Sequence, residues 1–154
     1  MDQSSIVFIS IISAAGLAAL VLAAFFVARA WKHRWRSLEM DDMEGHEFEY
    51  FCADLLRDKG FLDVEVTRGS GDFGVDILAE KDGVTYAVQC KCYNAPIGIK
   101  AVQEIYAGRD YYDRMVGVVM TNQYFTSAAV DAAKKLKILL WDRGYLESMM
   151  EELD

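Results

Sequence analysis

Three kinds of hydrophobic pattern follow one another along this chain. Residues 6–28 form an uncharged, mostly apolar run, and residues 45–59 then place Phe48, Phe51, Cys52, Leu55 and Leu56 at helical spacing. Residues 61–68 alternate between apolar and polar, which predicts a half-exposed strand. Further helices are predicted at 99–112 and 126–135, and strands buried on both faces at 115–121 and 137–141. The order predicts an α/β domain with a mixed central sheet flanked by helices, after one apolar helix.

The apolar run at residues 6–28 is long enough to span a membrane. Its 23 residues would extend roughly 34 Å as a helix, against about 30 Å of hydrocarbon. We therefore predict a transmembrane helix within residues 1–30 and a juxtamembrane linker over 31–43. A secretory signal peptide would instead begin with positive charge and have a shorter apolar core. Positive residues follow the run, at Arg29, Lys32, Arg34 and Arg36, so we expect a single-pass protein of the inner (cytoplasmic) membrane with its C-terminal domain in the cytoplasm.

Charge and cysteine content limit the functions of the second part. The chain has a net charge of -8, and subtracting the +2 of residues 1–40 leaves -10 for residues 41–154. Such an acidic domain is a poor nonspecific binder of nucleic acid, because that affinity comes mainly from Lys and Arg. Cys52, Cys90 and Cys92 suit a reduced compartment. No second Cys or His pair stands at zinc-ligand spacing, so a structural zinc site is not expected.

The stretch from Gly69 to Lys91 carries the candidate chemistry. Its predicted hairpin consists of an apolar strand over 75–79 that contains Asp76, an Asp-Gly turn, and a returning strand over 84–92. Gln89 and Lys91 share one face of the returning strand. A buried carboxylate is costly without a partner, and two interpretations stay open. Asp76 and Lys91 form a cross-strand ion pair beside a solvated Gln89, or Asp76 binds a divalent cation while Lys91 orients water and stabilises a phosphate.

The arrangement of Asp76, a hairpin and then Gln89-Cys90-Lys91 resembles the PD-(D/E)xK nuclease signature. It is most similar to the Mrr-type branch, in which glutamine usually replaces the second acid. The resemblance also covers GHEFEYFCADLLRDKG (45–60), GDFGVDI (71–77), AVQCK (87–91) and VMTN with the following Phe-Thr (119–126). It therefore identifies residues 44–154 as an Mrr-type, restriction-endonuclease-like domain.

This resemblance implies a metal-dependent DNA endonuclease of the restriction or repair type. It implies Mg²⁺, with Mn²⁺ as an alternative, bound by Asp76, Glu49, Gln89 and the Cys90 backbone carbonyl, and Lys91 as the group that positions the attacking water. From spacing alone, Glu49 is equally well a solvated helix glutamate. DNA is the expected partner besides the membrane, and a homodimer would supply the two active sites that a double-strand cut needs.

Two other classes of function remain open. The acidic balance and the neutral Gln89 favour a membrane-anchored nuclease-like module that binds DNA or protein without cleaving, and a pure assembly platform is a third alternative. Other candidate contacts are Lys100 and Arg109 on a helix, Asn122 to Tyr124 after a central strand, and the basic cluster Lys134, Lys135 and Lys137. The glycine pattern at 69–74 opens a strand rather than a helix, so a dinucleotide site is not expected. The tail from Tyr145 is predicted to be a short frayed helix.

Overall fold

The computed structural model describes residue 16 and residues 19–27, 40–67 and 73–151. The chain divides into two compact units, Met1–Arg36 and Ser37–Asp154. In the first unit the described residues 19–27 are helical and expose large apolar side chains such as Leu20 and Phe26. The membrane helix predicted at 6–28 falls partly outside the described residues. Among those described, no helix is both long and apolar enough to cross a membrane.

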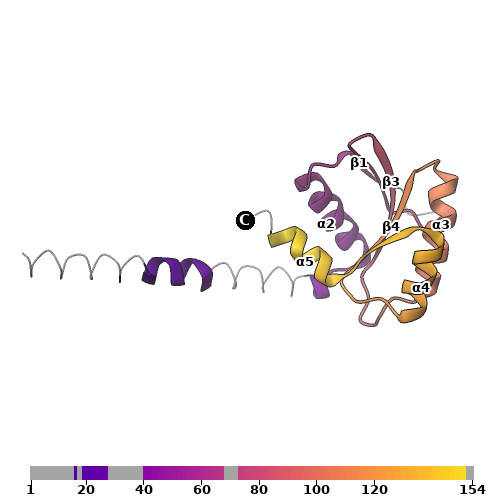
Figure 1. The fold of residues 1–154 in the computed structure, drawn as a ribbon. Coiled ribbons are helices and arrows are strands. Elements are labelled where there is room, and N and C mark those ends of the chain that lie inside the picture. Colours follow the sequence, from indigo (N-terminus) through magenta and orange to yellow (C-terminus); the bar gives the residue numbers. More distant parts are fainter. Residues whose placement is uncertain (1–15, 17–18, 28–39, 68–72, 152–154) are drawn as a thin grey trace, which may run out of the picture. The chain divides into compact units, whose positions relative to one another are not determined.

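The second unit is built on a five-stranded sheet in the order β1-β2-β3-β4-β5, and Figure 1 shows helices on both sides of it. The strands β1, β2 and β3 pair antiparallel, whereas β3, β4 and β5 run parallel, so the sheet is mixed as predicted. The parallel strands are the more buried ones, because helices cover both of their faces. The strands are Leu62–Val66, Ile77–Lys81, Val84–Lys91, Val116–Thr121 and Ile138–Trp141.

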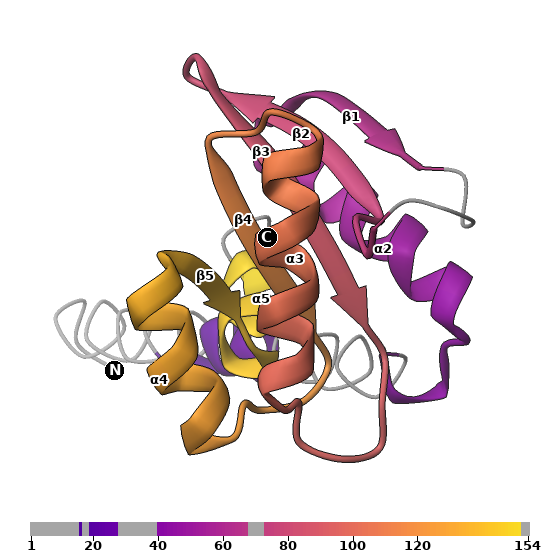
Figure 2. The same cartoon turned by 90° about the vertical axis from the view of Figure 1, so that its right-hand side faces the viewer.

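Helices cover the two faces of the sheet in pairs. Helices α2 and α5 pack on one face, and α3 and α4 lie together on the other, as the turned view shows (Figure 2). Each face has its own apolar core, one around Phe48, Leu56 and Met120 and the other around Val102 and Ile105. The helices are Gly45–Asp58 (α2), Ile99–Tyr111 (α3), Ser127–Leu136 (α4) and Arg143–Glu151 (α5).

Most of the predicted elements are confirmed to within two residues. The β2-β3 hairpin turns at Asp82 and Gly83, which both have positive φ (53° and 76°), as a type I′ turn requires. Thr126 caps α4 by accepting a hydrogen bond from the Ala129 N–H at 3.3 Å. The tail from Tyr145 is helical as predicted, but over residues 143–151 it is not frayed: α5 buries Leu146, Met149 and Met150, which complete the core on the α2 face.

The domain also begins earlier than the predicted boundary at residue 44. Residues 40–42 are helical, and Met40 is completely buried among the core residues of the α2 face. Residues 40–43, expected to be linker, therefore pack as part of the domain.

Candidate active site

Strand β3 directs Gln89 and Lys91 toward helix α3. The neighbouring residues Val88 and Cys90 belong to the core on the α2 face, so the alternation of the strand sends Gln89 and Lys91 to the opposite side. Gln89 is completely buried, and the interpretation of it as a solvated strand residue is therefore wrong. A buried amide must find hydrogen-bond partners within the protein or in a ligand.

Helix α3 supplies that partner through Glu104. The Gln89 Nε2 donates a hydrogen bond to Glu104 Oε2 at 2.9 Å, and Lys91 Nζ lies 3.3 Å from the same oxygen. Lys100 Nζ lies 3.5 Å from Glu104 Oε1, one helical turn away. One carboxylate thus holds the amide and the ammonium of the two strand residues in a fixed relation.

The environment of Glu104 keeps its carboxyl group ionised. Burial raises the pKa of this carboxyl, but the hydrogen bond from Gln89 and the positive charge of Lys91 outweigh burial and hold the pKa below its ordinary value of 4.5. Glu104 is therefore a carboxylate at neutral pH, and it forms an ion pair with Lys91.

Asp76 completes the group that we call the Glu104 cluster: Asp76, Gln89, Lys91 and Glu104. The Asp76 backbone is bonded on both sides, since its N–H donates to Val88 O at 2.8 Å and its C=O accepts from Thr67 N–H at 2.9 Å. The Asp76 carboxylate accepts a 2.6 Å hydrogen bond from the backbone N–H of Cys90. This bond fixes the carboxylate beside the peptide that joins Gln89 to Cys90.

Gly74 closes the cluster from the side of the loop before β2. It has a φ of +76°, and a Cβ at this position would lie 2.7 Å from Gln89 Nε2 and 3.2 Å from Glu104 Cβ. The loop backbone therefore passes directly against the Gln89–Glu104 pair. Only glycine combines this φ with so close an approach.

Glu49 lies on α2, on the other side of strand β3. Its carboxylate is 2.8 Å from His46 Nδ1, and its side chain is 17% exposed. Burial raises the pKa of the Cys90 thiol well above its usual value, the Cys52 thiol raises it further, and the charges of Asp76 and Glu49 add to this. The charges of Glu49 and Asp76 thus both act on Cys90 of β3. Its role as a metal ligand, like that of the Cys90 carbonyl, stays a prediction.

A pocket opens beside the cluster. It has a volume of about 240 Å³ and lies between the end of β3 and the start of α3; its lining residues are Lys91, Tyr93, Pro96, Ile97, Gly98, Lys100, Ala101 and Glu104. Two ammonium groups and the exposed ring of Tyr93 line it. A larger pocket of about 590 Å³ is lined by Phe61, Tyr86 and Trp141, which belong to the opposite face. We assign the site to the smaller pocket because it contains Lys91 and Glu104.

The donor atoms of the cluster suit a hard divalent cation. Gln89 Oε1 is buried without a hydrogen-bond partner, and an amide oxygen beside carboxylates is a ligand set that Mg²⁺ accepts. Within residues 40–67 and 73–151, no three His, Cys, Asp or Glu side chains form a metal-binding group. A metal ion at this place would therefore depend on the neutral oxygen of Gln89 as well as on the carboxylates.

Two other candidate sites receive different roles. Asn122 is completely buried, and its amide is bonded to Tyr93 N–H and to Asp41, so its side chain is not a free ligand. Lys134 and Lys135 are exposed in the last turn of α4, before Ile138, which pairs with Gly117 at the start of β4. Lys91 pairs with Thr121 at the opposite end of β4. The basic cluster thus lies at the opposite end of the sheet from the Glu104 cluster.

Glu104 was not among the residues predicted for the site. The signal for it was its place on the predicted helix, three residues after the buried Ala101 and four before the buried Gly108. An acid at this spacing lies at the border of the buried stripe, where a carboxylate can reach into the interface between helix and sheet.

The mixed five-stranded sheet with helices on both faces is the fold of a restriction-endonuclease-like α/β domain. Residues 40–150 match the family of Mrr catalytic domains (Mrr_cat), described as restriction endonuclease. The chain belongs to this family.

Solved structures of similar proteins agree with this fold. The protein of unknown function AF1548 is 25% identical, with a TM-score of 0.53 over 64% of this chain and 62% of its own. The DNA modification-dependent restriction endonuclease AspBHI is 21% identical, with a TM-score of 0.56 over 81% of this chain and 34% of its own. The MspJI restriction endonuclease, solved with a 27-mer oligonucleotide, is 19% identical, with a TM-score of 0.53 over 80% and 31%. This chain therefore spans less than two thirds of each of them, and no curated protein matches it.

Proposed function

We propose that this protein is a Mg²⁺-dependent DNA endonuclease that hydrolyses phosphodiester bonds at the Glu104 cluster, with Mn²⁺ as an alternative ion. The observation that carries the proposal is the shared carboxylate: Glu104 holds the buried amide of Gln89 and the ammonium of Lys91 beside the fixed carboxylate of Asp76. The Mrr family membership supports DNA as the substrate.

The residues of the cluster divide metal binding and phosphate chemistry between them in this proposal. Asp76 and the Gln89 Oε1 would hold the metal ion, together with Glu49 and the Cys90 carbonyl. When bound, the ion would polarise the scissile phosphate and lower the pKa of a bound water. Lys91 orients the attacking water and stabilises negative charge on the phosphate, and the ion pair with Glu104 holds the Lys91 ammonium in place.

The pocket beside the cluster would receive the DNA strand. Lys100 is 87% exposed at its rim and would contact a phosphate next to the scissile one. The Tyr93 ring, 55% exposed, offers a surface on which a base can stack. The pocket thus combines the positive charge and the aromatic surface that a nucleic-acid strand requires, despite the acidic total of the domain.

We further propose that the N-terminal segment holds the domain at the inner (cytoplasmic) membrane as a single-pass helix. The support is the uncharged run at 6–28, the positive residues that follow it, and the exposed apolar side chains of the helical residues 19–27. A glycosylation-site scan would test the topology: a site placed before residue 6 should be modified in microsomes, and a site placed after residue 40 should not.

A specific observation favours a second candidate, a tethered module that binds DNA or protein without cleaving it. The net charge of -10 in residues 41–154 opposes DNA binding, and Gln89 adds no charge to a metal site. This candidate predicts binding without hydrolysis.

Plasmid cleavage separates the two candidates. The purified full chain, with Mg²⁺ or Mn²⁺, should nick supercoiled plasmid, and Asp76→Asn should abolish the nicking because its carboxylate is replaced by an amide. Asp131→Asn is the matched control, since Asp131 is an exposed carboxylate on α4, and it should cleave normally. DNA retention on a filter without any metal-dependent nicking would favour the binding module instead.

A further inference from the structure

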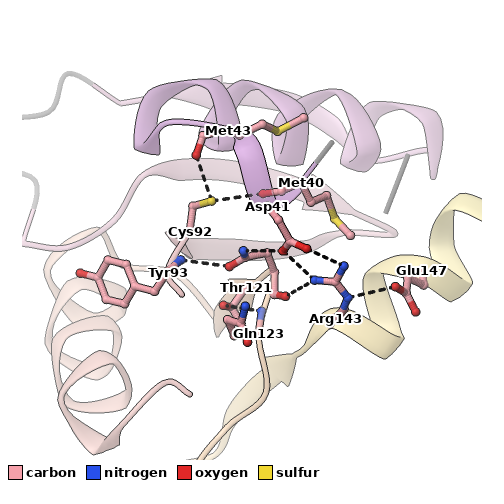
Figure 3. Close-up of polar contacts among 10 residues, drawn as sticks. Met40, Asp41, Met43, Cys92, Tyr93, Thr121, Gln123, Arg143 and Glu147 are labelled. Atoms are coloured by element: carbon pink, nitrogen blue, oxygen red, sulfur yellow. Dashed lines mark hydrogen bonds and ion pairs between the residues drawn. The ribbon is translucent and has the colours of Figure 1, made fainter. Parts of the chain in front are cut away.

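The two residues that follow the end of β3, Cys92 and Tyr93, are held by residues from outside the sheet. The Cys92 thiol donates to the backbone oxygens of Met40 and Met43, both at 3.3 Å. The Tyr93 backbone N–H donates to Asn122 Oδ1 at 3.0 Å (Figure 3). The two residues after Lys91 are thus tied in succession, the first to residues 40–43 and the second to Asn122.

Asn122 connects this strand end to the start of the domain. Its Nδ2 donates to Asp41 Oδ1 at 3.1 Å, so both ends of its buried amide are used, one on Tyr93 and one on Asp41. A buried amide satisfied at both ends has one orientation, because turning it over would place donor against donor and acceptor against acceptor. The position of Asp41 therefore determines how Asn122 meets Tyr93.

Arg143 of α5 fixes Asp41 in turn. Its guanidinium binds the Asp41 carboxylate through two bonds, at 2.7 and 3.0 Å, and donates to the Asn122 backbone oxygen at 2.9 Å. On its far side the Arg143 Nε donates to Glu147 Oε1 at 3.2 Å. The hydrogen bond from Arg143 lowers the pKa of the Asp41 carboxyl, so this bidentate pair is charge-assisted.

We propose that Asn122 and Asp41 are positioning residues for the cleavage reaction: by holding the Cys92–Tyr93 backbone they keep Lys91 at its place on Glu104. This inference rests on the proposed function. Lys91 is the last residue of β3, and the chain then leaves the sheet toward α3, which carries Glu104. Without the bond from Asn122, the backbone beyond Cys92 loses a contact that restricts the approach of Lys91 to Glu104. Cleavage thereby depends on the docking of residues 40–43.

The first test compares the kinetics of full-chain variants on supercoiled plasmid with Mg²⁺. Asn122→Ala and Asp41→Ala should lower kcat by about 10- to 100-fold, as expected when a reacting group is misplaced by about an ångström, and leave KM within twofold. Glu147→Gln is the matched control, because it removes a contact of Arg143 without touching Asn122, and its kcat should be unchanged. Leu146→Ala controls for loss of stability, and below its melting temperature it should also retain kcat.

The second test reads the coupling without cleavage, by exchange of the Tyr93 amide hydrogen. Asp41→Ala should raise its exchange rate at least tenfold, about 1.4 kcal/mol of protection, and Glu147→Gln should not. Unchanged exchange in Asp41→Ala would overturn the coupling, and faster exchange with normal kcat would overturn the positioning role. If the wild-type chain does not cleave plasmid, the proposed function fails and the inference fails with it. If the wild-type chain cleaves and Asn122→Ala and Asp41→Ala cleave at the same rate, only the inference fails.

Discussion

The close approach of Gly74 to the Gln89–Glu104 pair gives a prediction that isolates this contact from backbone strain. Replacing Gly74 by Ala places a methyl group 2.7 Å from Gln89 Nε2 at a φ of +76°. Gly83 has the same φ of +76°, but nothing lies within 4 Å of its added Cβ. Both substitutions therefore incur the left-handed strain of about 1 to 2 kcal/mol, and only Gly74→Ala displaces Gln89.

The magnitude follows from the bond that is lost. A hydrogen bond to a charged group contributes about 1.5 to 3 kcal/mol, so we expect Gly74→Ala to be roughly 2 kcal/mol less stable than Gly83→Ala. At a urea m-value of about 2 kcal/mol/M, its midpoint should lie about 1 M lower. Plasmid cleavage should fall in Gly74→Ala and persist in Gly83→Ala. Equal urea midpoints for the two variants would refute the reasoning, because the contact with Gln89 would then contribute nothing.

Three further predictions concern other parts of the domain. The pKa of Glu104 is lower in the folded chain than its ordinary value of 4.5, so the ionised carboxylate stabilises the fold above that pH, and this stabilisation is lost as the pH falls below it. Glu104→Gln should therefore flatten the acid side of a profile of melting temperature against pH, and it should reduce cleavage about 10- to 100-fold. Superimposable profiles for the variant and the wild type would contradict this. Leu146→Ala should cost about 2 to 5 kcal/mol in denaturant unfolding, whereas Leu62→Ala, 64% exposed, should cost about 0.5 kcal/mol or less. Lys100→Ala should raise the KM for DNA and lessen its salt dependence, and an unchanged salt slope would remove Lys100 from the DNA path.

The elements with a regular hydrophobic period were predictable from the sequence. The apolar run at 115–121 indicated a central strand, and β4 is Val116–Thr121 with its last five residues buried. The Asp-Gly turn placed the hairpin, because both residues accept positive φ. The hairpin in turn placed Gln89 and Lys91 on one face, which the contacts of Glu104 confirm.

The contacts that complete the site depend on packing between distant segments, which no local pattern encodes. Glu104 and Gln89 are 15 residues apart in the sequence, and they meet because α3 packs closely against the loop before β2. The packing is so close that a Cβ added to Gly108 of α3 would lie 2.8 Å from the Phe73 backbone oxygen. Asp41 meets Asn122 across 81 residues. The helix α5 was predicted to be frayed because acidic residues lie between its apolar ones, so little in the sequence indicated that Leu146 and Met150 are buried.

The measurement that tests the central claim most directly is the single-turnover rate of plasmid cleavage by the full chain at saturating Mg²⁺, compared between Lys91→Ala and Lys134→Ala. Lys91 lies on Glu104, whereas Lys134 is exposed on α4. We predict that Lys91→Ala loses at least about 100-fold in rate, as for other groups that stabilise a transition state, and that Lys134→Ala stays within twofold of the wild type. Equal rates for the two variants would contradict the assignment of the Glu104 cluster as the catalytic centre.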